Sequence, residues 1–263
     1  MTQLRVLVVG ASGRMGSEVV RAVTKADGLA LVGAADRTRV GEDAGMVAGV
    51  LPAGVVITDS LSDAIAQSSP DVIVDFTIPD AVMGNIRTAL KAGVACVVGA
   101  TGLTEQNLSE IAALCDERKT PAFVAPNFAI GAVLMMQFAA QAARHFGSAE
   151  IIELHHADKL DAPSGTALRT AQLMASVSGS QFAGGQSADG RAARGQTEGR
   201  IHIHSVRLPG LVAHQEVIFG GLGETLTIRH DSTSRESFMP GVLLAIRKVQ
   251  GLKGLVVGLE RLL

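Results

Sequence analysis

The chain has 263 residues, 23 Lys and Arg against 25 Asp and Glu, a formal net charge of -2, eight Phe and neither Trp nor Tyr. This length suffices for a substantial core and we expect two domains, while the lack of a basic surplus and of stacking side chains argues against nucleic-acid binding. No apolar run is long enough to span a membrane, no signal peptide is recognisable, and Cys96 and Cys115 lack a Cys-x-x-Cys spacing, so we expect reduced, buried thiols in a cytoplasmic protein.

An apolar strand, a glycine turn and a helix are predicted first. Leu4–Val9 is followed by glycines at 10, 13 and 16 and then by a helical pattern to about Lys25. Glycines in such a unit permit a tight turn, the approach of a pyrophosphate and close helix packing, with the phosphates at the helix N-terminus. The spacing is G-x-x-G-x-x-G and not G-x-G-x-x-G, and an ordinary strand-to-helix turn is the alternative. Its position directly after the first strand favours a dinucleotide site.

The second predicted strand, 29–35, ends at Asp36 and Arg37, 20 residues after Gly16. An acidic residue here can accept hydrogen bonds from the adenosine ribose, whereas an arginine can pair with a 2'-phosphate. The presence of both predicts tolerance of NAD and NADP. Because Asp36 repels a 2'-phosphate, we expect NAD to bind at least as well.

Strands and helices continue to alternate up to about residue 146. After a loop at 38–60 with some helix near 43–50, the sequence predicts strands at 71–75, 94–98 and 121–125 and helices at 80–92, 104–118 and 130–146. The alternation is typical of a Rossmann-type doubly wound parallel sheet, an α/β fold whose ligands bind at the carboxyl ends of the strands. The small-residue turn Gly99–Gly102 lies at such an end, where it could pass beneath a nicotinamide ribose.

The pattern changes after residue 150, where strands follow one another with fewer helices between them. These strands are predicted at 150–155, 201–206, 211–219 and 224–230. They indicate an α+β domain with a mixed sheet. Residues 177–199, rich in Gly, Ser, Gln and Arg, are interpreted as a long mobile loop over the site or between subunits.

A final helix at 237–249 and an apolar run at 254–258 are expected to return to the first domain. We therefore predict a dinucleotide-binding domain of residues 1–128 and 238–263, and a substrate-binding and oligomerisation domain of residues 129–237.

The densest chemistry lies between the strand at 150–155 and a predicted helix at 166–174. His155 and His156 can exchange protons near neutral pH, and Lys159 can neutralise a carboxylate or give up a proton. Ser164 reads as an N-cap, so that free N–H groups of Ser164, Gly165 and Thr166 would face an anion. The alternative is that one imidazole is structural, because adjacent strand residues point to opposite faces.

His202 and His204 have a spacing found among metal ligands, yet no Cys or carboxylate stands near them in the sequence. We expect no metal.

Several motifs together resemble the 4-hydroxy-tetrahydrodipicolinate reductase family, also called dihydrodipicolinate reductase. They are Gly10-Ala-Ser-Gly-Arg-Met-Gly16, Gly99-Ala-Thr-Gly102, Ala125-Pro-Asn-Phe128, Glu153-x-His-His-x-x-Lys-x-Asp-Ala-Pro-Ser-Gly-Thr-Ala167, Arg207-Leu-Pro-Gly-Leu-Val-Ala-His214, Arg229-His-Asp-Ser232 and Phe238-Met-Pro-Gly241. The resemblance spans the chain and implies an NADH- or NADPH-dependent step of the diaminopimelate route to lysine, in the cytoplasm and in a homotetramer joined through the substrate-domain sheets.

The resemblance also implies roles for individual residues. His155 would donate or accept the proton as hydride reaches ring carbon 4, Lys159 would be a second donor, and His156, Ser164, Gly165 and Thr166 would contact the substrate. The dinucleotide would be held by Gly10, Ala11, Ser12, Gly13, Arg14, Met15, Asp36, Arg37, Gly99, Ala100, Thr101, Ala125, Pro126, Asn127 and Phe128. Ala100, where the family commonly has Thr, and the run Ala129-Ile-Gly-Ala-Val133, where it commonly has Ser and Asn, remove hydrogen-bonding groups and bear on affinity more than on the reaction.

Two alternatives remain. One is a nucleotide-responsive sensor that binds the cofactor without turnover, and the other is a related two-domain dehydrogenase acting on an aspartate-derived substrate. A short-chain dehydrogenase is excluded, because that chemistry needs a tyrosine and the chain has none.

Overall fold

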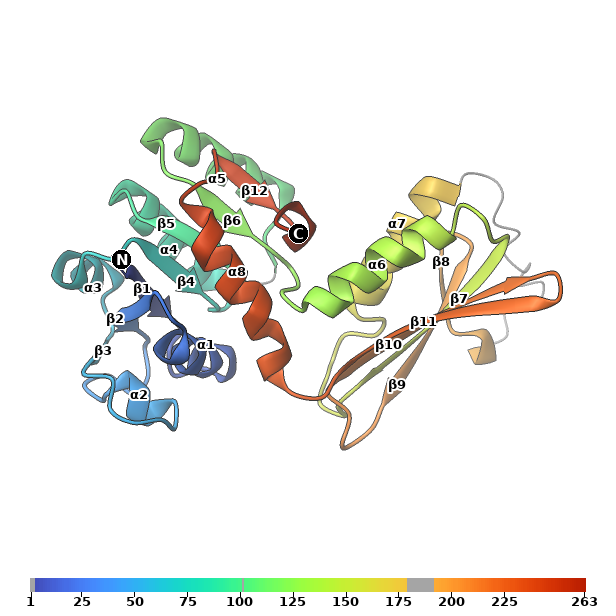
Figure 1. Ribbon diagram of the computed structural model, residues 1–263, viewed down its shortest axis with the longest axis horizontal. Helices are drawn as coiled ribbons and strands as arrows, with labels where there is room; N and C mark the ends of the chain where they lie inside the picture. Colours follow the sequence, from blue (N-terminus) through green and yellow to red (C-terminus); the bar gives the residue numbers. More distant parts are fainter. Residues whose placement is uncertain (1–2, 101, 179–191) are drawn as a thin grey trace. The chain divides into compact units, whose positions relative to one another are not determined.

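The computed structural model describes residues 3–100, 102–178 and 192–263, and its Cα positions group into two compact units (Figure 1). The first unit consists of Met1–Phe128 and Phe238–Leu263, and the second of Ala129–Ser237.

A seven-stranded parallel sheet forms the first unit, with the strand order β12-β6-β5-β4-β1-β2-β3. Its strands are β1 (Leu4–Val9), β2 (Leu29–Ala35), β3 (Ile57–Thr58), β4 (Val72–Asp75), β5 (Ala95–Val98), β6 (Ala122–Val124) and β12 (Leu255–Val257). The helices of this unit are α1 (Arg14–Lys25), α2 (Ala44–Val47), α3 (Leu61–Ser68), α4 (Pro79–Lys91), α5 (Glu105–Arg118) and α8 (Met239–Val249). The order reverses direction between β1 and β4, which is the point where doubly wound sheets bind their ligands.

Helices on both faces explain why β4 and β5 are buried along their whole length and β1 over its last four residues. Leu7, Ile73 and Cys96 pack with the apolar sides of α3, α4 and α5, whereas α1 and α8 cover the opposite face (Figure 1). Because both faces are covered, the strands read as continuous apolar runs. The Rossmann-type fold expected from the sequence is confirmed.

A five-stranded mixed sheet forms the second unit, in the order β11-β10-β7-β9-β8. Its elements are α6 (Ile130–Ala142), β7 (Ser148–His155), α7 (Gly165–Ser178), a 3₁₀ turn (Ala192–Arg194), β8 (Gln196–Glu198), β9 (Ile201–Arg207), β10 (Ala213–Gly221), β11 (Glu224–Ser232) and a 3₁₀ turn that reaches Phe238 of the first unit (Arg235–Phe238). β7 and β9 are parallel and the other pairs antiparallel. Both helices pack on one face of this sheet, where Ala139, Ala171, Ile151 and Phe219 share a core.

Several predicted boundaries differ from the structure. α6 ends at Ala142 and not near Phe146, because the N–H groups of Arg144 and His145 bond three residues back and tighten the last turn. The region 38–60, predicted as a loop with some helix, contains α2 and the short strand β3, and α3 follows it. Of the predicted mobile loop at 177–199, the ends belong to α7, a 3₁₀ turn and β8, and residues 179–191 lie outside the described residues. No helix in the described ranges is long and apolar enough to cross a membrane.

Candidate active site

A cavity of about 360 Å³ opens at the carboxyl ends of β1, β2 and β4 in the first unit. Four of the predicted cofactor residues line it, namely Gly10, Gly13, Asp36 and Arg37. It lies at the reversal of the strand order, as expected of a dinucleotide site.

The glycine turn is a structural requirement of this cavity. Gly10 has a φ of +79°, a backbone conformation that residues other than glycine rarely adopt. A Cβ at Gly16 would stand 1.8 Å from the carbonyl oxygen of Gly10. The turn leads directly into α1, whose N-cap residue Gly13 supplies no capping side chain. The first N–H groups of α1 are therefore left for a ligand, and an anion such as a pyrophosphate fits there.

Asp36 is oriented before any cofactor binds. Its Oδ2 accepts a hydrogen bond from the Ser12 N–H at 3.0 Å, and its Oδ1 accepts bonds from the N–H and hydroxyl of Thr38 at 3.0 and 3.1 Å. Burial alone would raise the pKa of Asp36, but these hydrogen bonds outweigh burial and lower it. An ionised carboxylate at this position accepts hydrogen bonds, as a ribose requires, and repels a phosphate.

The other predicted cofactor residues occupy further strand ends of the same sheet. Gly99 and Ala100 follow β5, and Ala125–Phe128 follow β6. A Cβ at Gly99 would stand 2.1 Å from the ring of Phe76, so glycine is needed for this close contact. Thr101 lies outside the described residues.

Two residues of the cavity wall, Phe76 and Thr77 at the end of β4, were not assigned from the sequence. Thr77 is held by Asp75, a fully buried carboxylate whose Oδ1 accepts bonds from the N–H and hydroxyl of Thr77 at 2.7 and 2.6 Å. Burial raises the pKa of Asp75 in spite of these bonds. Their place at the end of a predicted strand was the available signal, whereas their position beside the glycine turn arises only in the folded sheet, where β4 pairs with β1.

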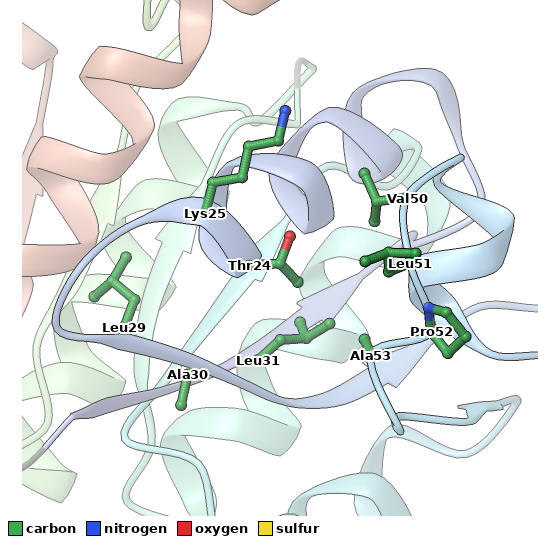
Figure 2. A pocket seen from close by; sticks show the side chains of 9 residues that line it. All are labelled: Thr24, Lys25, Leu29, Ala30, Leu31, Val50, Leu51, Pro52 and Ala53. Carbon is green, nitrogen blue, oxygen red and sulfur yellow. The ribbon is translucent and has the colours of Figure 1, made fainter.

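A larger cavity of about 660 Å³ lies elsewhere in the first unit, between the end of α1, the start of β2 and residues 50–53 (Figure 2). It is at the amino end of β2, away from the glycine turn. Lys25 and Thr24 are the polar side chains of its lining. Since one ammonium and one hydroxyl supply little chemistry, we do not assign the active site to it.

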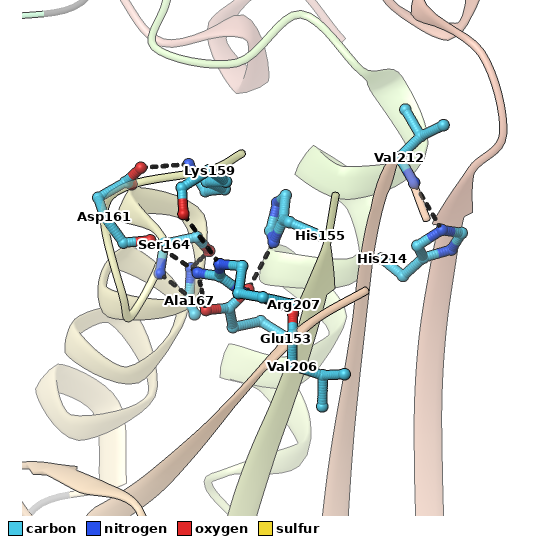
Figure 3. Close-up of polar contacts among 10 residues, drawn as sticks. All are labelled: Glu153, His155, Lys159, Asp161, Ser164, Ala167, Val206, Arg207, Val212 and His214. Carbon is cyan, nitrogen blue, oxygen red and sulfur yellow. Dashed lines mark hydrogen bonds and ion pairs between the residues drawn. The ribbon is translucent and has the colours of Figure 1, made fainter. Parts of the chain in front are cut away.

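In the second unit, Glu153 holds the predicted proton donor His155 (Figure 3). Its side chain is fully buried, and its Oε2 lies 2.5 Å from the Nδ1 atom of His155. Arg207 donates to both carboxylate oxygens, at 2.7 and 2.9 Å. Burial opposes ionisation of Glu153, yet the bonds with His155, Arg207 and Ser205 lower its pKa to about 2. At neutral pH the carboxylate is ionised.

Lys159 lies on the loop between β7 and α7, and its Nζ donates to Asp161 Oδ1 at 2.6 Å. The turn that carries it is closed by a bond from the Lys159 N–H to the His156 carbonyl. The side chains of His155 and Lys159 are 14% and 22% exposed, so both reach the surface of this unit. The structure thus places an imidazole and an ammonium within one strand-to-helix connection.

The start of α7 differs in one respect from the prediction. Ser164 caps the helix, since its hydroxyl accepts from the Ala167 N–H, but its own N–H donates to Glu153 Oε1 at 3.2 Å and is not free for a ligand. At Gly165, which begins the helix, no protein atom other than its chain neighbours and the backbone of the same helix lies within 4 Å of the place of a Cβ. An anion can therefore approach the backbone at Gly165 closely.

Glu153 and Arg207 were not predicted as site residues. Glu153 lies two residues before His155 on the same face of β7, which was a readable signal. Arg207 is brought opposite His155 by the parallel register of β7 and β9.

The two histidines considered for metal binding have other partners. His204 Nε2 lies 2.7 Å from Glu150, and His202 Nδ1 lies 3.4 Å from the Thr197 hydroxyl. Within the described part of the chain, no three His, Cys, Asp or Glu side chains gather as a metal site.

Known proteins of one family match this chain over essentially its whole length. Family models for the N-terminus and C-terminus of dihydrodipicolinate reductase match residues 4–128 and 131–263. The 4-hydroxy-tetrahydrodipicolinate reductase of Moorella thermoacetica is 54% identical over 261 residues, covering 99% of this chain and 98% of the relative. That of Desulfitobacterium hafniense is 51% identical, with 100% of both chains covered.

A solved structure of the same family is also similar to this chain in fold and in sequence. The dipicolinate-bound dihydrodipicolinate reductase from Paenisporosarcina sp. TG-14 superposes with a TM-score of 0.85 at 42% identity over 100% of both chains. An amine dehydrogenase from Mycobacterium smegmatis, at 16% identity and a TM-score of 0.68 over 97% of this chain and 95% of that one, shares the fold alone.

Proposed function

Because this chain belongs to the dihydrodipicolinate reductase family, we infer that it reduces 4-hydroxy-tetrahydrodipicolinate, by way of dihydrodipicolinate, to tetrahydrodipicolinate with NADH or NADPH in lysine biosynthesis. The main structural support for this function is that His155, at the end of β7, and Lys159, on the following loop, both precede the N-terminus of α7 in one strand-to-helix connection. The sensor reading and the aspartate-derived alternative lose their support, since full-length relatives are named as this reductase.

The first unit fits the dinucleotide. The glycine turn holds its close backbone packing only without side chains, since a Cβ at Gly16 would collide with the Gly10 carbonyl, and Asp36 is ionised at the end of β2. We assign the pyrophosphate to residues 10–15 and the adenosine ribose to Asp36 and Arg37, with 99–101 and 125–128 toward the nicotinamide. Bound NADH or NADPH supplies the hydride, which adds to ring carbon 4 of the substrate.

The second unit fits a substrate with two carboxylates. One carboxylate is assigned to the N-terminus of α7 at Gly165 and Thr166, where the helix dipole favours negative charge; Ser164, whose N–H is taken by Glu153, is left out of this assignment. The other is assigned to Lys159 and His156, whose side chains lie on the connection before the helix. Binding there requires Lys159 to exchange or share its present partner Asp161.

His155 is assigned the proton that completes the reduction. Hydride adds to ring carbon 4 of the carbon–carbon double bond that is conjugated with the imine, and the displaced electron pair gives an enamine with the negative charge on the ring nitrogen. A proton on the neighbouring ring carbon of the former double bond restores the imine and completes the reduction. His155 is held by Glu153 and reaches the surface, as a general acid must. Lys159 is the second candidate donor.

A homotetramer in the cytoplasm completes the proposal. One face of the mixed sheet is covered by α6 and α7, and the opposite face carries partly exposed residues such as Ile152 and Ile218. That face is the one we assign to subunit contacts. The buried free thiols of Cys96 and Cys115 accord with a reducing compartment.

The function is tested by following the absorbance of reduced nicotinamide while the preceding synthase makes the substrate from pyruvate and aspartate semialdehyde. We expect rapid loss of absorbance that requires both the synthase and this protein, with NADH and NADPH compared in parallel. If there is no loss although the cofactor binds, the sensor reading returns.

A further inference from the structure

We infer that Glu153 and Arg207 act as one positioning pair, which keeps the Nδ1–H tautomer of His155 and leaves Nε2 as the atom that exchanges protons with the substrate. The inference rests on the proposed function, because it concerns the imidazole assigned to protonation. Neither residue touches the substrate in this proposal. They act through His155 and through the loop that carries Lys159.

The first step is the completeness of the contacts to Glu153. Oε1 accepts bonds from Arg207 at 2.7 Å and from the Ser164 N–H at 3.2 Å, and Oε2 lies 2.9 Å from Arg207 and 2.5 Å from His155. A fully buried carboxylate is very unfavourable unless it is paired in this way. Glu153 therefore stays where these partners hold it.

The second step concerns the protons. With a pKa of about 2, Glu153 is ionised and can only accept hydrogen bonds. The short contact between Glu153 and His155 must then carry a hydrogen on Nδ1 of the imidazole. Nε2 is the other ring nitrogen, and the 14% exposure of the side chain gives the ring access to the surface.

The third step is the reach of Arg207. Its Nε donates to the Lys159 carbonyl at 3.3 Å and its Nη2 to the Asp161 carbonyl at 2.6 Å, in addition to the bonds to Glu153. One planar guanidinium thus joins β9, β7 and the loop of Lys159. A lysine could not make these bonds together, because its three donors do not form a planar fork.

A purely structural role for the pair is the competing explanation. Buried ion pairs can often be replaced by apolar side chains without loss of stability, so stability alone does not explain this pair. The two explanations differ in what they predict for the state of the imidazole.

The primary test is Glu153→Gln, which keeps the size of the side chain and removes its charge. An amide can accept from or donate to Nδ1, so the tautomer is no longer imposed. We expect kcat to fall about 100-fold, within the range that a positioned acid or base contributes, with KM for NADH within about twofold of wild type. In ¹⁵N-histidine spectra at a pH where the ring is neutral, the His155 signals, assigned by comparison with His155→Gln, should show a single Nδ1–H form in wild type and a mixture in the variant.

Two further variants show whether an effect of Glu153→Gln comes from misfolding or from the loss of the charge at Glu153. Arg207→Lys keeps the charge and leaves Glu153 ionised, and we expect the single tautomer to persist while kcat falls about tenfold through the loosened Lys159 loop. Glu110→Gln is the matched control, because it removes a two-pronged Arg–Glu contact, with Arg87, on the surface of the first unit. We expect its kcat and its nitrogen spectrum to equal those of wild type.

The inference is overturned if folded Glu153→Gln keeps kcat within twofold of wild type, or if its His155 spectrum still shows only the Nδ1–H form. If wild type itself does not reduce the cyclic imine, the proposed function fails, and the spectra of the same proteins still decide whether the pair holds the imidazole.

Discussion

Removing the guanidinium at position 207 should weaken the second unit much more than an ordinary surface change. Arg207→Met deletes both bonds to Glu153 and those to the carbonyls of Lys159 and Asp161. It leaves a fully buried anion with His155, Ser205 and the Ser164 N–H as its contacts, and without a paired cation of fixed charge. Breaking one side of a buried pair costs about 3–5 kcal/mol. The gap between the ordinary pKa of 4.5 and the folded value of about 2 corresponds to about 3 kcal/mol for all partners of Glu153.

The pH dependence has a definite sign. Because the folded pKa of Glu153 lies below its unfolded value, ionised Glu153 stabilises the fold above pH 4.5, and this is lost as the pH falls from 4.5 through about 2. In Arg207→Met the pKa of Glu153 rises, since burial is no longer outweighed. The difference in stability between wild type and variant should therefore be largest at neutral pH and narrow in acid.

Amide hydrogen exchange measures this within the unit concerned. A loss of about 3 kcal/mol corresponds to about 100-fold faster exchange in the β7 and β9 amides that open with the unit. The double variant Glu153→Gln/Arg207→Met leaves no unpaired charge and should exchange more slowly than Arg207→Met alone. Exchange in Arg207→Met within twofold of wild type at neutral pH would refute the reasoning.

The remaining predictions concern the cofactor cradle and the proton donors. Gly16→Ala places a Cβ 1.8 Å from Gly10 O, and we expect a lower melting temperature, a loss of about 1–3 kcal/mol and weaker NADH binding in a fluorescence titration; unchanged binding would contradict it. Asp36→Ala should shift the ratio of KM values toward NADPH about tenfold, or about 1.4 kcal/mol, and an unaltered ratio would remove Asp36 from cofactor choice. His155→Gln should lower kcat about 100-fold with NADH binding intact, so normal turnover would exclude its role. Lys159→Ala should raise KM for the imine and lower kcat, and the assignment is wrong if neither changes.

The first unit was largely predictable from the sequence. Its strands are apolar runs that end at glycine or at a charged residue, and Asp36 and Gly10 stand directly at such ends. The short elements β3 and α3, and β8 of the second unit, were not predicted, because segments of two to eight residues show little periodicity. For α3 a signal existed, since Ser60 caps the helix by accepting from the Asp63 N–H.

The second unit shows where a single sequence becomes insufficient. His155 and Lys159 lie four residues apart and could be associated directly. Arg207 lies 54 residues from Glu153 and meets it only because β9 pairs with β7 in one parallel register. The N–H of Ser164 was predicted to face an anion but donates to Glu153, eleven residues earlier, because the connection between β7 and α7 folds back on the strand. Local patterns do not report such partners.

The return of the chain to its first sheet has a consequence for the order of folding. β12 pairs with the edge of β6, and Val242, Ala245 and Ile246 of α8 are buried. The first unit is closed by residues from the far side of the second unit, whereas the second unit is continuous in sequence. Contacts between segments so distant in sequence carry a large loop-closure entropy, so we expect β12 and α8 to join the first sheet late in folding. Until they join, β6 is an open edge to which a strand of another copy can add.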